Sequence, residues 1–311
     1  MRMLYEVIDL GTFGDASYAN AINGSGQVVG LSGKHPFLFD GKTMIDISVL
    51  GANAISSALD INDVGHIVGT AEVSGNGQAF YFDGTSVTVL AGPISSAYGI
   101  NDNDQVVGIA PANTLYPTEA ALFENAGVTD LGQGEARDIS STGMIVGATK
   151  DNLGVLRAGF YTAGLWTNID LGPLNWTPGS IAIGVNKYGH IVGTLSLNTG
   201  GPVAFFYESG SSLTILTPLP PWLNLNATAL NVWDSVVGRG SILTRGVTHA
   251  FVWDVAAGIR DLNDLIQSNS GWELTAASDI NDNGQIVGSG LFYGQMRAFR
   301  LDPVMYRAPF Y

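Results

Sequence analysis

The sequence predicts an all-β fold, a seven-bladed β-propeller with four antiparallel strands in each blade. Three observations lead to this prediction. A segment of the form Ile-Asn-x-x-Gly-x-Ile-Val-Gly recurs along the 311 residues. The strands around it carry apolar residues at consecutive positions, which indicates sheets that are buried on both faces. One strand that the last repeat lacks is found at the front of the chain, so the first and last repeats can close a ring.

The recurring segment opens each of seven repeats. Its copies lie at residues 22–30, 61–69, 100–108, 139–147, 185–193, 230–238 and 280–288, and an alanine lies four residues before the Asn position of each copy. Each copy predicts two short strands joined by an Asn-Asp-x-Gly turn, in which glycine supplies a positive φ. Asp104 and Asp234 replace this glycine in two copies. Aspartate is among the few other residues that tolerate such a conformation.

Two further strands follow in each repeat. A run of small and aromatic residues, such as residues 79–82, is separated by a turn from a short Asp-Leu strand, such as residues 46–47. The seventh Asp-Leu strand is missing after the last repeat and occurs instead near the N-terminus.

We therefore expect residues 4–10 to complete the last blade, beside strands at about 277–281, 285–289 and 297–302. This pairing leaves no open sheet edge at the junction. An open solenoid is the structural alternative. We expect one propeller domain over residues 1–303 and a C-terminal tail at 304–311.

Composition excludes several classes of function. The chain has 27 acidic and 13 basic residues, a net charge of −14, which disfavours nucleic acid and anionic membrane surfaces as partners. The acidic balance permits cation binding, or serves solubility alone. The absence of cysteine excludes disulfides, thiolate catalysis and Cys-ligated zinc. No apolar run is long enough to span a bilayer.

The repeat resembles that of the HAF-repeat family of bacterial proteins, named for His-Ala-Phe. The full triplet occurs at residues 249–251, and Ala-x-x-Ile-Asn-x-x-Gly-x-Ile-Val-Gly recurs throughout. Residues 261–266 with 270–275 look like the family's last repeat. The resemblance covers nearly the whole chain and implies an extracellular protein of unknown function, often anchored by a tail that residues 304–311 do not provide. The first six residues lack the apolar core of a signal peptide. We thus expect a cytoplasmic protein if the chain is full length, or an extracellular one if a signal was removed.

The connections from the fourth strand of one repeat to the first strand of the next vary most in length, so we expect the binding face there. Trp176, Trp222 and Trp272 fall in the longest of these connections, with Asn175 and Asn224 beside the first two. Exposed indoles next to amides can stack on a sugar or another flat ligand. The alternative is that these tryptophans fill gaps between blades or pack their own loops.

Charged residues also suggest a site at the central channel. Arg137 and Asp138, with Glu135, are interpreted as charged exceptions to the first-strand pattern. An enzyme could use them, or Glu273, as acid/base or electrostatic groups in an axial pocket. The alternative is a local ion pair or a solvated channel lining.

Two metal hypotheses have weaker support. Asp279, Asn281 and Asn283 match the opening of a calcium loop, but the late acidic ligand of such a loop is absent. We expect no cofactor, with calcium as the alternative. The histidines exchange with glutamine in equivalent repeat positions, as at His66 and Gln27, which suggests hydrogen bonding without titration.

The sequence thus favours a non-enzymatic binding propeller that recognises a carbohydrate, small molecule or protein through its variable face. The first alternative is an enzyme, such as a hydrolase, lyase or cyclase, with an axial pocket. The second is a structural or surface repeat protein. The sequence does not fix the ligand or the oligomeric state.

Overall fold

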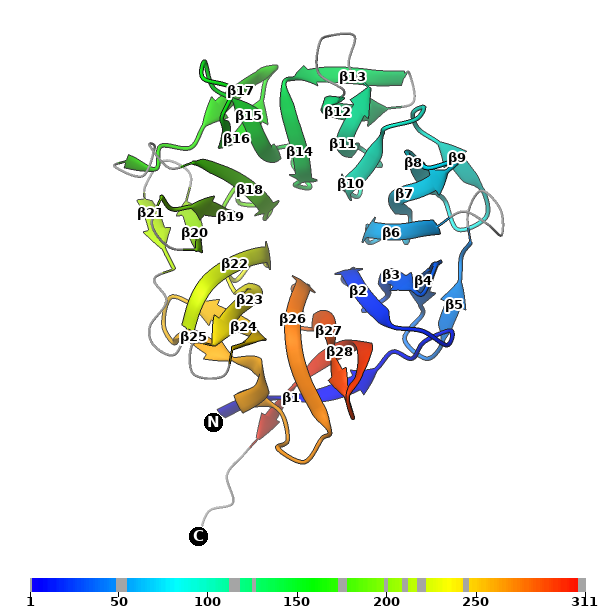
Figure 1. Ribbon diagram of the computed structural model, residues 1–311, viewed down its shortest axis with the longest axis vertical. Coiled ribbons are helices and arrows are strands. Elements are labelled where there is room, and N and C mark those ends of the chain that lie inside the picture. The colour runs from blue at the N-terminus through cyan, green and yellow to red at the C-terminus, as the bar shows by residue number, and fades with distance from the viewer. Residues whose placement is uncertain are drawn as a thin grey trace.

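Seven four-stranded antiparallel sheets stand around a central channel in the computed structural model (Figure 1). The structure describes residues 2–48, 55–111, 118–124, 127–172, 178–198, 201–208, 212–216, 222–242 and 246–306. The fold is therefore the seven-bladed β-propeller that the repeat predicts, and the ring excludes the open solenoid.

The strands of each blade follow one another along the chain from the channel outward. Blade 1 holds β2 (Ser17–Ile22), β3 (Val28–Ser32), β4 (His35–Phe39) and β5 (Met44–Asp46). Blade 2 holds β6 (Ile55–Ile61), β7 (Ile67–Val73), β8 (Asn76–Phe82) and β9 (Val87–Val89). Blade 3 holds β10 (Ser96–Ile100), β11 (Val106–Pro111), β12 (Thr118–Glu124) and β13 (Gly127–Gly132).

The second half of the ring repeats this order. Blade 4 holds β14 (Gly134–Ile139), β15 (Ile145–Lys150), β16 (Leu156–Thr162) and β17 (Leu165–Asn168). Blade 5 holds β18 (Gly179–Val185), β19 (Ile191–Ser196), β20 (Pro202–Glu208) and β21 (Ser212–Ile215). Blade 6 holds β22 (Trp222–Leu230), β23 (Val236–Ile242), β24 (Val247–Asp254) and β25 (Gly258–Asp261), and the short 3₁₀ helix η2 (Leu262–Leu265) follows it.

Blade 7 closes the ring as expected. It holds β26 (Trp272–Ile280), β27 (Ile286–Phe292) and β28 (Gln295–Tyr306), and the N-terminal β1 (Arg2–Asp9) pairs with β28 as its outer strand. The register runs from Arg2 opposite Tyr306 to Asp9 opposite Phe299. The last strand is longer than expected, so residues 304–306, which the sequence placed in the tail, pair with β1. No helix in the described part of the chain is long and apolar enough to cross a membrane.

The glycine of each Ile-Val-Gly segment is explained by close contact. In blade 1, a Cβ on Gly30 would lie 2.0 Å from the carbonyl oxygen of Tyr18 and 2.8 Å from the Phe37 ring. A Cβ on Gly69 or on Gly193 would make equivalent contacts. Because any side chain there would overlap the backbone of the preceding strand, the repeat keeps glycine at this position.

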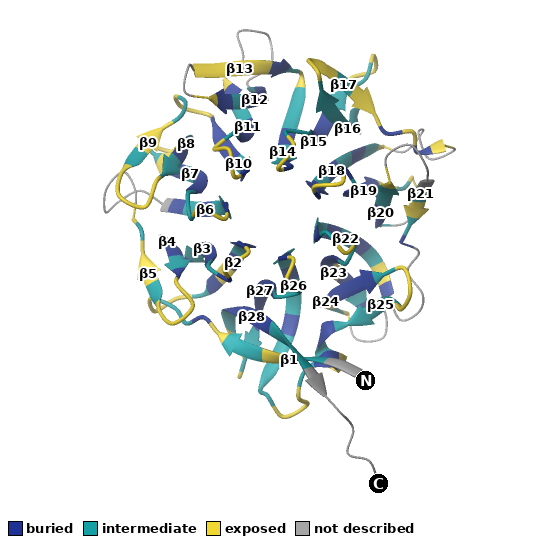
Figure 2. Cartoon of the chain, turned by 180° about the vertical axis from the view of Figure 1, so that it is seen from behind, coloured by how far each residue is buried: buried dark blue, intermediate teal, exposed yellow. Residues whose placement is uncertain are grey.

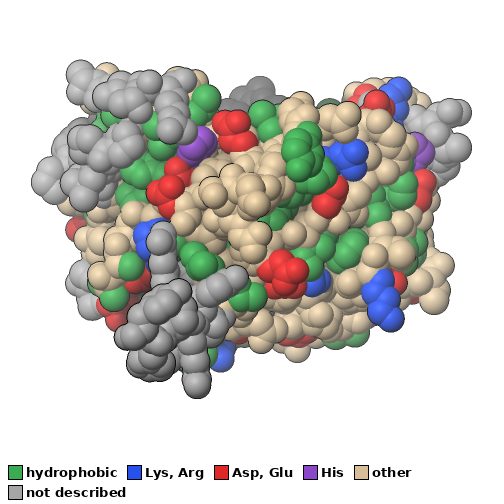
Figure 3. All heavy atoms as spheres, turned by 90° about the horizontal axis from the view of Figure 1, so that it is seen from below, with side chains coloured by type: hydrophobic (Ala, Val, Ile, Leu, Met, Phe, Trp, Pro, Cys, Tyr) green, Lys and Arg blue, Asp and Glu red, His purple; other side chains and the backbone are tan. Residues whose placement is uncertain are grey.

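Burial differs between the strands of a blade and is lowest in the outermost strand. The second strands, such as β15 and β27, are largely buried, the innermost strands that face the channel are less so, and much of β5, β9, β13 and β17 is exposed (Figure 2). On the side of the ring that carries β1, acidic and basic side chains are interspersed without an extended basic stripe (Figure 3).

Candidate functional site

Every inner strand carries a β-bulge at the same place. The pairing register shifts directly after the alanine that recurs in each repeat. The shift lies between Ala19 and Ala21 in β2, for example, and between Ala136 and Asp138 in β14. Neighbouring residues of a regular strand point to opposite faces, and a bulge re-aims one of them. The bulge residues are Asn20, Leu59, Tyr98, Arg137, Ile183, Thr228 and Ser278.

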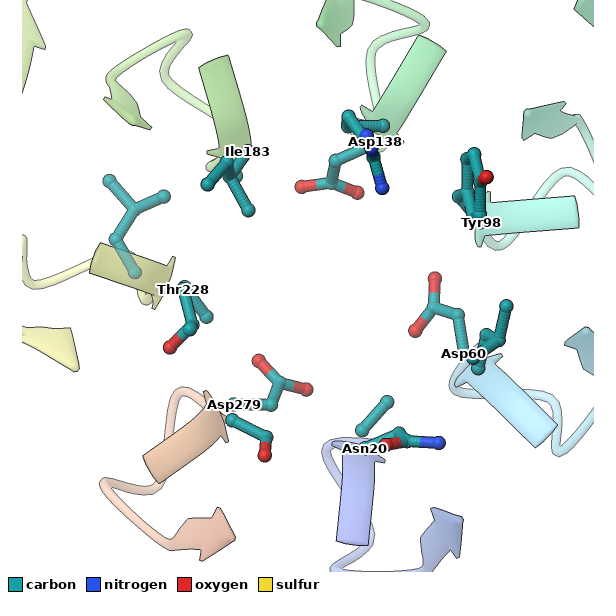
Figure 4. A pocket seen from close by; sticks show the side chains of 14 residues that line it. Asn20, Asp60, Tyr98, Asp138, Ile183, Thr228 and Asp279 are labelled. Carbon is teal, nitrogen blue, oxygen red and sulfur yellow. The ribbon is translucent and has the colours of Figure 1, made fainter. Parts of the chain in front are cut away.

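The bulges surround an axial cavity of about 360 Å³. Its walls are the seven bulge residues and most of the residues that follow them, which include Asp60, Asp138 and Asp279. The three carboxyls come from blades 2, 4 and 7 and point into the channel (Figure 4). We call these three residues the aspartate layer. The interpretation of Asp138 as an exception to the repeat was wrong, because the bulge aligns it with Asp60 and Asp279.

Each carboxyl of the aspartate layer links two blades. The Oδ2 atom of Asp60 accepts a hydrogen bond of 2.8 Å from the Ile100 amide of blade 3. Asp138 accepts one of 2.8 Å from the Val185 amide of blade 5, and Asp279 accepts one of 2.9 Å from the Ile22 amide of blade 1. The Oδ1 atom of each aspartate accepts the amide of its own following residue. Both oxygens of each carboxyl therefore have backbone partners.

The surroundings of the aspartate layer favour protonation. Burial raises the pKa of Asp60 well above its ordinary value, and the charges of Asp138 and Asp279 raise it further. Burial also raises the pKa of Asp138, to about 6, against the opposing backbone hydrogen bonds. Burial raises the pKa of Asp279 in the same way. Although each carboxyl is open to the channel, protein surrounds it closely, so water solvates its charge poorly.

Arg137 projects into the cavity between two partners. Its guanidinium donates a hydrogen bond to the Glu135 carboxylate of the same strand, and its Cζ lies 4.5 Å from the centre of the Tyr98 ring of blade 3. Its buried Nε atom has no hydrogen-bond partner within the described ranges. The predicted ion pair and the predicted channel position of Arg137 are thus both present, with Glu135 as the positioning residue.

A second ring of contacts lies two residues beyond the aspartate layer. We call it the asparagine collar: Asn23, Asn62, Asn101, Asn186, Asn231 and Asn281, with Ser140 in the equivalent position of blade 4. Each collar asparagine donates from Nδ2 to the backbone oxygen of the equivalent residue in the next blade, at 3.0–3.1 Å. Its Oδ1 accepts the amide four residues later, as from Gln27. The asparagine of the repeat thus fastens its own turn and the next blade.

The residues of the calcium hypothesis take part in these contacts. Asp279 accepts two backbone amides, Asn281 belongs to the collar, and Asn283 donates a 2.8 Å hydrogen bond to the Gly24 carbonyl oxygen of blade 1. The described residues contain no group of three or more His, Asp or Glu side chains suited to hold a metal ion.

The two aspartates in glycine positions of the turns behave as predicted. Asp104 and Asp234 have φ values of 58° and 57°. The Oδ1 atom of each aspartate is also 2.7 Å from the Nδ1 atom of a histidine in the preceding blade. Asp104 pairs with His66, and Asp234 pairs with His190. The hydrogen bonding expected of these histidines is present. Sequence reasoning missed the pairing, although each histidine stands one blade before an aspartate that replaces glycine.

The tryptophans expected on the variable face do not form one site. Trp222 is the first residue of β22 and is only 7% exposed, with its ring 6.1 Å from that of Phe251, so it belongs to the core between blades. Asn224 lies in the same strand, half-buried, with a φ of 52°. Asn175 and Trp176 lie outside the described residues. The expectation of an exposed indole in a connection therefore does not hold for Trp222.

Trp272 and Glu273 begin β26, away from the axial cavity. Trp272 is half-buried and stacks on Phe292 with 5.0 Å between ring centres. The Glu273 carboxylate is 3.7 Å from Nε2 of His249, whose Nδ1 is 2.7 Å from Asp261. His35 and Asp46 make the same His–Asp contact in blade 1, at 3.0 Å, which marks it as a repeated structural pair.

Comparisons with known proteins identify the fold and no more. No family model matches the sequence, and no curated protein matches it. The structure is similar to virginiamycin B lyase from Staphylococcus aureus, with a TM-score of 0.58 and 11% identity over 97% of this chain and 100% of that one. It is also similar to the acylaminoacyl peptidase of Pyrococcus horikoshii, with a TM-score of 0.56 and 10% identity over 96% of this chain and 54% of that one. At such identities the likeness shows a shared propeller fold alone.

Proposed function

We propose that this protein is a ligand-binding propeller that takes a small polar ligand in its axial cavity. The observation that supports this best is the set of seven bulges, which bring side chains from every blade to one place. Three carboxyls, one guanidinium and one phenol ring converge there. A volume of about 360 Å³ is within the range of small-molecule pockets. The repeat motif additionally supports membership of the HAF-repeat family.

The lining indicates the chemistry of the ligand. Asp60, Asp138 and Asp279 offer hydrogen-bond acceptors and, where protonated, donors, because burial raises their pKa values. Arg137 offers donors, and Tyr98 with the aliphatic Leu59 and Ile183 offers apolar walls. Such a site suits a hydroxyl-rich or amine-bearing compound of about monosaccharide size. This retains the carbohydrate or small-molecule ligand expected from the sequence and moves it from the variable face to the axis.

A second candidate is an enzyme at the same cavity. The observation in its favour is Asp138, because a carboxyl whose pKa is about 6 can exchange protons near neutral pH. Its neighbour Arg137 could stabilise a developing negative charge. A lyase is among the proteins that share the fold.

A ligand screen with matched variants tests the proposal. Monosaccharides, amino sugars and small amines would be screened by thermal shift, since a ligand of the folded state raises the melting temperature. Affinities would then be compared in the wild type, Arg137→Ala and Asp138→Asn. Arg239→Ala is the matched control, because Arg239 is exposed on β23 and does not line the cavity.

We expect both cavity variants to weaken binding by roughly tenfold or more, as for hydrogen bonds to charged groups, and the control to leave it unchanged. Equal affinity in all four proteins would place the ligand elsewhere and contradict the proposal. Chemical conversion of a bound compound, lost in Asp138→Asn, would favour the enzyme. Absence of any shift across the panel would count against both candidates.

A further inference from the structure

A second cavity on the channel axis opens at the face of the ring that carries the turns after the innermost strands. It has a volume of about 330 Å³, and we call it the turn mouth. Collar residues and the residues that follow them form much of its wall, as Asn62 and Asp63 do. The axial cavity is lined by slightly earlier residues of the same blades, such as Leu59 and Asp60. The two cavities therefore follow one another along the channel.

One side of the turn mouth offers hydrogen-bond acceptors. Asp63 of blade 2, Asp102 of blade 3 and Asp282 of blade 7 line the cavity. The Oδ1 atom of each accepts a backbone amide from the turn of the preceding blade, at 2.6–3.0 Å. The Oδ2 atom of each has no hydrogen-bond partner among the residues that the structure describes. These three oxygens can therefore accept hydrogen bonds from a ligand.

The opposite side of the turn mouth carries exposed aromatic rings. Two residues after the collar asparagine stand Tyr188 in blade 5 and Trp233 in blade 6, which are 62% and 73% exposed. Strands β18 and β22, which lead into these two turns, lie across the channel from β6 and β10 of blades 2 and 3 (Figure 1). The equivalent residues of the other blades are Ser25, Val64, Asn103, Thr142 and Asn283. Two adjacent blades thus carry large rings at a position where the others carry none.

Both rings are held in place at the edge of the cavity. The Nε1 atom of Trp233 donates a 3.0 Å hydrogen bond to the carbonyl oxygen of Asp282, in the turn of blade 7. The Tyr188 ring centre lies 5.2 Å from the Nζ atom of Lys187, a lining residue, and 6.1 Å from the ring centre of His190. Because these contacts already orient the rings, a ligand that stacks on them loses less binding free energy to side-chain ordering.

This combination of groups matches a neutral carbohydrate. Aromatic rings stack on the apolar faces of sugar rings, and sugar hydroxyls donate strong hydrogen bonds to carboxylates. A nucleotide is disfavoured, because its phosphate would meet three carboxylates. A protein partner is disfavoured as well, since two exposed rings cover far less than the roughly 800 Å² that each partner buries in a stable interface.

We propose that the turn mouth binds a neutral oligosaccharide. One sugar stacks on Trp233, where its hydroxyls are close to the turn that carries the Asp282 carboxylate, and a neighbouring sugar extends across the mouth toward Asp63 and Asp102. The ligand has more than one sugar ring, because the aromatic and acidic groups lie on opposite sides of the channel. This site is separate from the axial cavity and does not rest on the ligand proposed there.

Titration of the whole chain with neutral oligosaccharides tests the proposal. The probes are maltohexaose, laminarihexaose, xylohexaose and N-acetylchitohexaose, each with its own monosaccharide, followed by tryptophan fluorescence and calorimetry. At least one hexasaccharide should bind at least tenfold more tightly than its monosaccharide, because a single ring does not reach both sides of the mouth. Its affinity should not change as salt is added, because the ligand carries no charge.

Aromatic variants then locate the stacking site. Trp233→Ala should weaken binding by at least tenfold, and urea unfolding would verify that this variant is folded. Trp233→Phe keeps an aromatic ring and loses only the Nε1 hydrogen bond, so it should retain most of the affinity. Tyr293→Ala is the matched control, because Tyr293 is an exposed aromatic residue in the turn after β27, away from the mouth, and should leave binding unchanged.

Acidic variants test the opposite side of the mouth. Asp102→Asn keeps an oxygen for the Asp63 amide and replaces the free Oδ2 acceptor, so it should weaken binding by about fivefold. Asp130→Asn is the matched control. Asp130 is exposed on β13, and its Oδ1 also accepts a backbone amide, that of Gly132. This control should bind like the wild type.

Several results would overturn the proposal. Absence of binding by all four hexasaccharides at millimolar concentration, or equal effects of Trp233→Ala and Tyr293→Ala, would remove the stacking argument. Loss of binding in Arg137→Ala would place the sugar in the axial cavity. Tighter binding of spermidine than of any hexasaccharide, weakened by salt, would show that the carboxylates select a cation. Sedimentation as a dimer that Trp233→Ala disperses would show that a second copy of the chain covers the rings.

Discussion

The asparagine collar lies two residues after the aspartate layer, where each innermost strand has just ended, and the two sets perform a similar task differently. Both reach from one blade to the backbone of the next. The collar is neutral and recurs at six of seven positions, with Ser140 as the exception. The layer is acidic and occupies three of seven positions. At the junction of blades 4 and 5 the serine side chain of Ser140 has no carboxamide N–H to donate. There the Asp138 carboxylate supplies a cross-blade hydrogen bond, which it accepts from the Val185 amide.

The difference separates scaffold from site. An asparagine satisfies its donor and acceptor within the protein and has no charge to desolvate, so the collar can be repeated at little cost. A carboxyl in the same surroundings loses the hydration of its charged form, which raises its pKa. It also keeps lone pairs that face the channel. The collar therefore holds the ring, and the positions three and two residues before it are free to vary and to bind.

Asn62→Ala should have the largest effect on stability. It removes a donor to the Asn101 carbonyl oxygen and the acceptor of the His66 amide, both at a buried position. We expect the free energy of unfolding to fall by roughly 3 kcal/mol, because a buried carbonyl oxygen and a part-buried amide lose their side-chain partner. Urea unfolding measures this. Asn103→Ala, at an exposed asparagine, is the matched control and should change stability by less than about 0.5 kcal/mol. Similar losses in both variants would show that the collar has no special role.

The aspartate layer should make stability fall as pH rises. Asp138 has a raised pKa of about 6 in the folded protein against an ordinary 3.8, so its contribution is fully present below pH 4 and is lost as pH rises through about 6. Relative to Asp138→Asn, the wild type should lose roughly 2 kcal/mol between pH 4 and pH 7.5. Urea unfolding of both proteins across this range measures the difference, which includes the effect of the Asp138 charge on the pKa of Asp60. A difference that does not change with pH would contradict the raised pKa.

Ser140→Asn should give the smallest effect, and with the opposite sign. The new amide would be placed to donate to the Asn186 carbonyl oxygen and complete the collar at blades 4 and 5. We expect a gain of about 1 kcal/mol in the free energy of unfolding, the net value of one hydrogen bond. Thermal unfolding with and without Asp138→Asn would sharpen the comparison. If the new hydrogen bond also joins blades 4 and 5, Asp138→Asn should lower the free energy of unfolding less in the Ser140→Asn background than in the wild type. Equal losses in the two backgrounds would show that the two hydrogen bonds act independently.

The alignment of the aspartate layer is visible in the sequence as a pair of variable positions in each innermost strand. Between the repeat alanine and the Ile-Asn pair, two adjacent positions vary from Arg137-Asp138 to Ile183-Gly184. Two variable neighbours inside an otherwise uniform strand are what a bulge on a channel produces, since both side chains face the same space. Recognising this would have aligned Asp138 with Asp60 and Asp279. Trp222 had no such signal, because indole burial depends on neighbours from another part of the chain.

The sequence by itself determined the number of blades, the strands in each and the closure by residues near the N-terminus. These follow from local patterns repeated seven times, and each blade is buried only if it stands between copies of itself. Tertiary structure alone decided which repeated polar groups meet. The asparagine collar and the aspartate layer join residues as far apart as Ile22 and Asp279. Their geometry and pKa values depend on the distance and dielectric between blades, which exist only once the ring has formed.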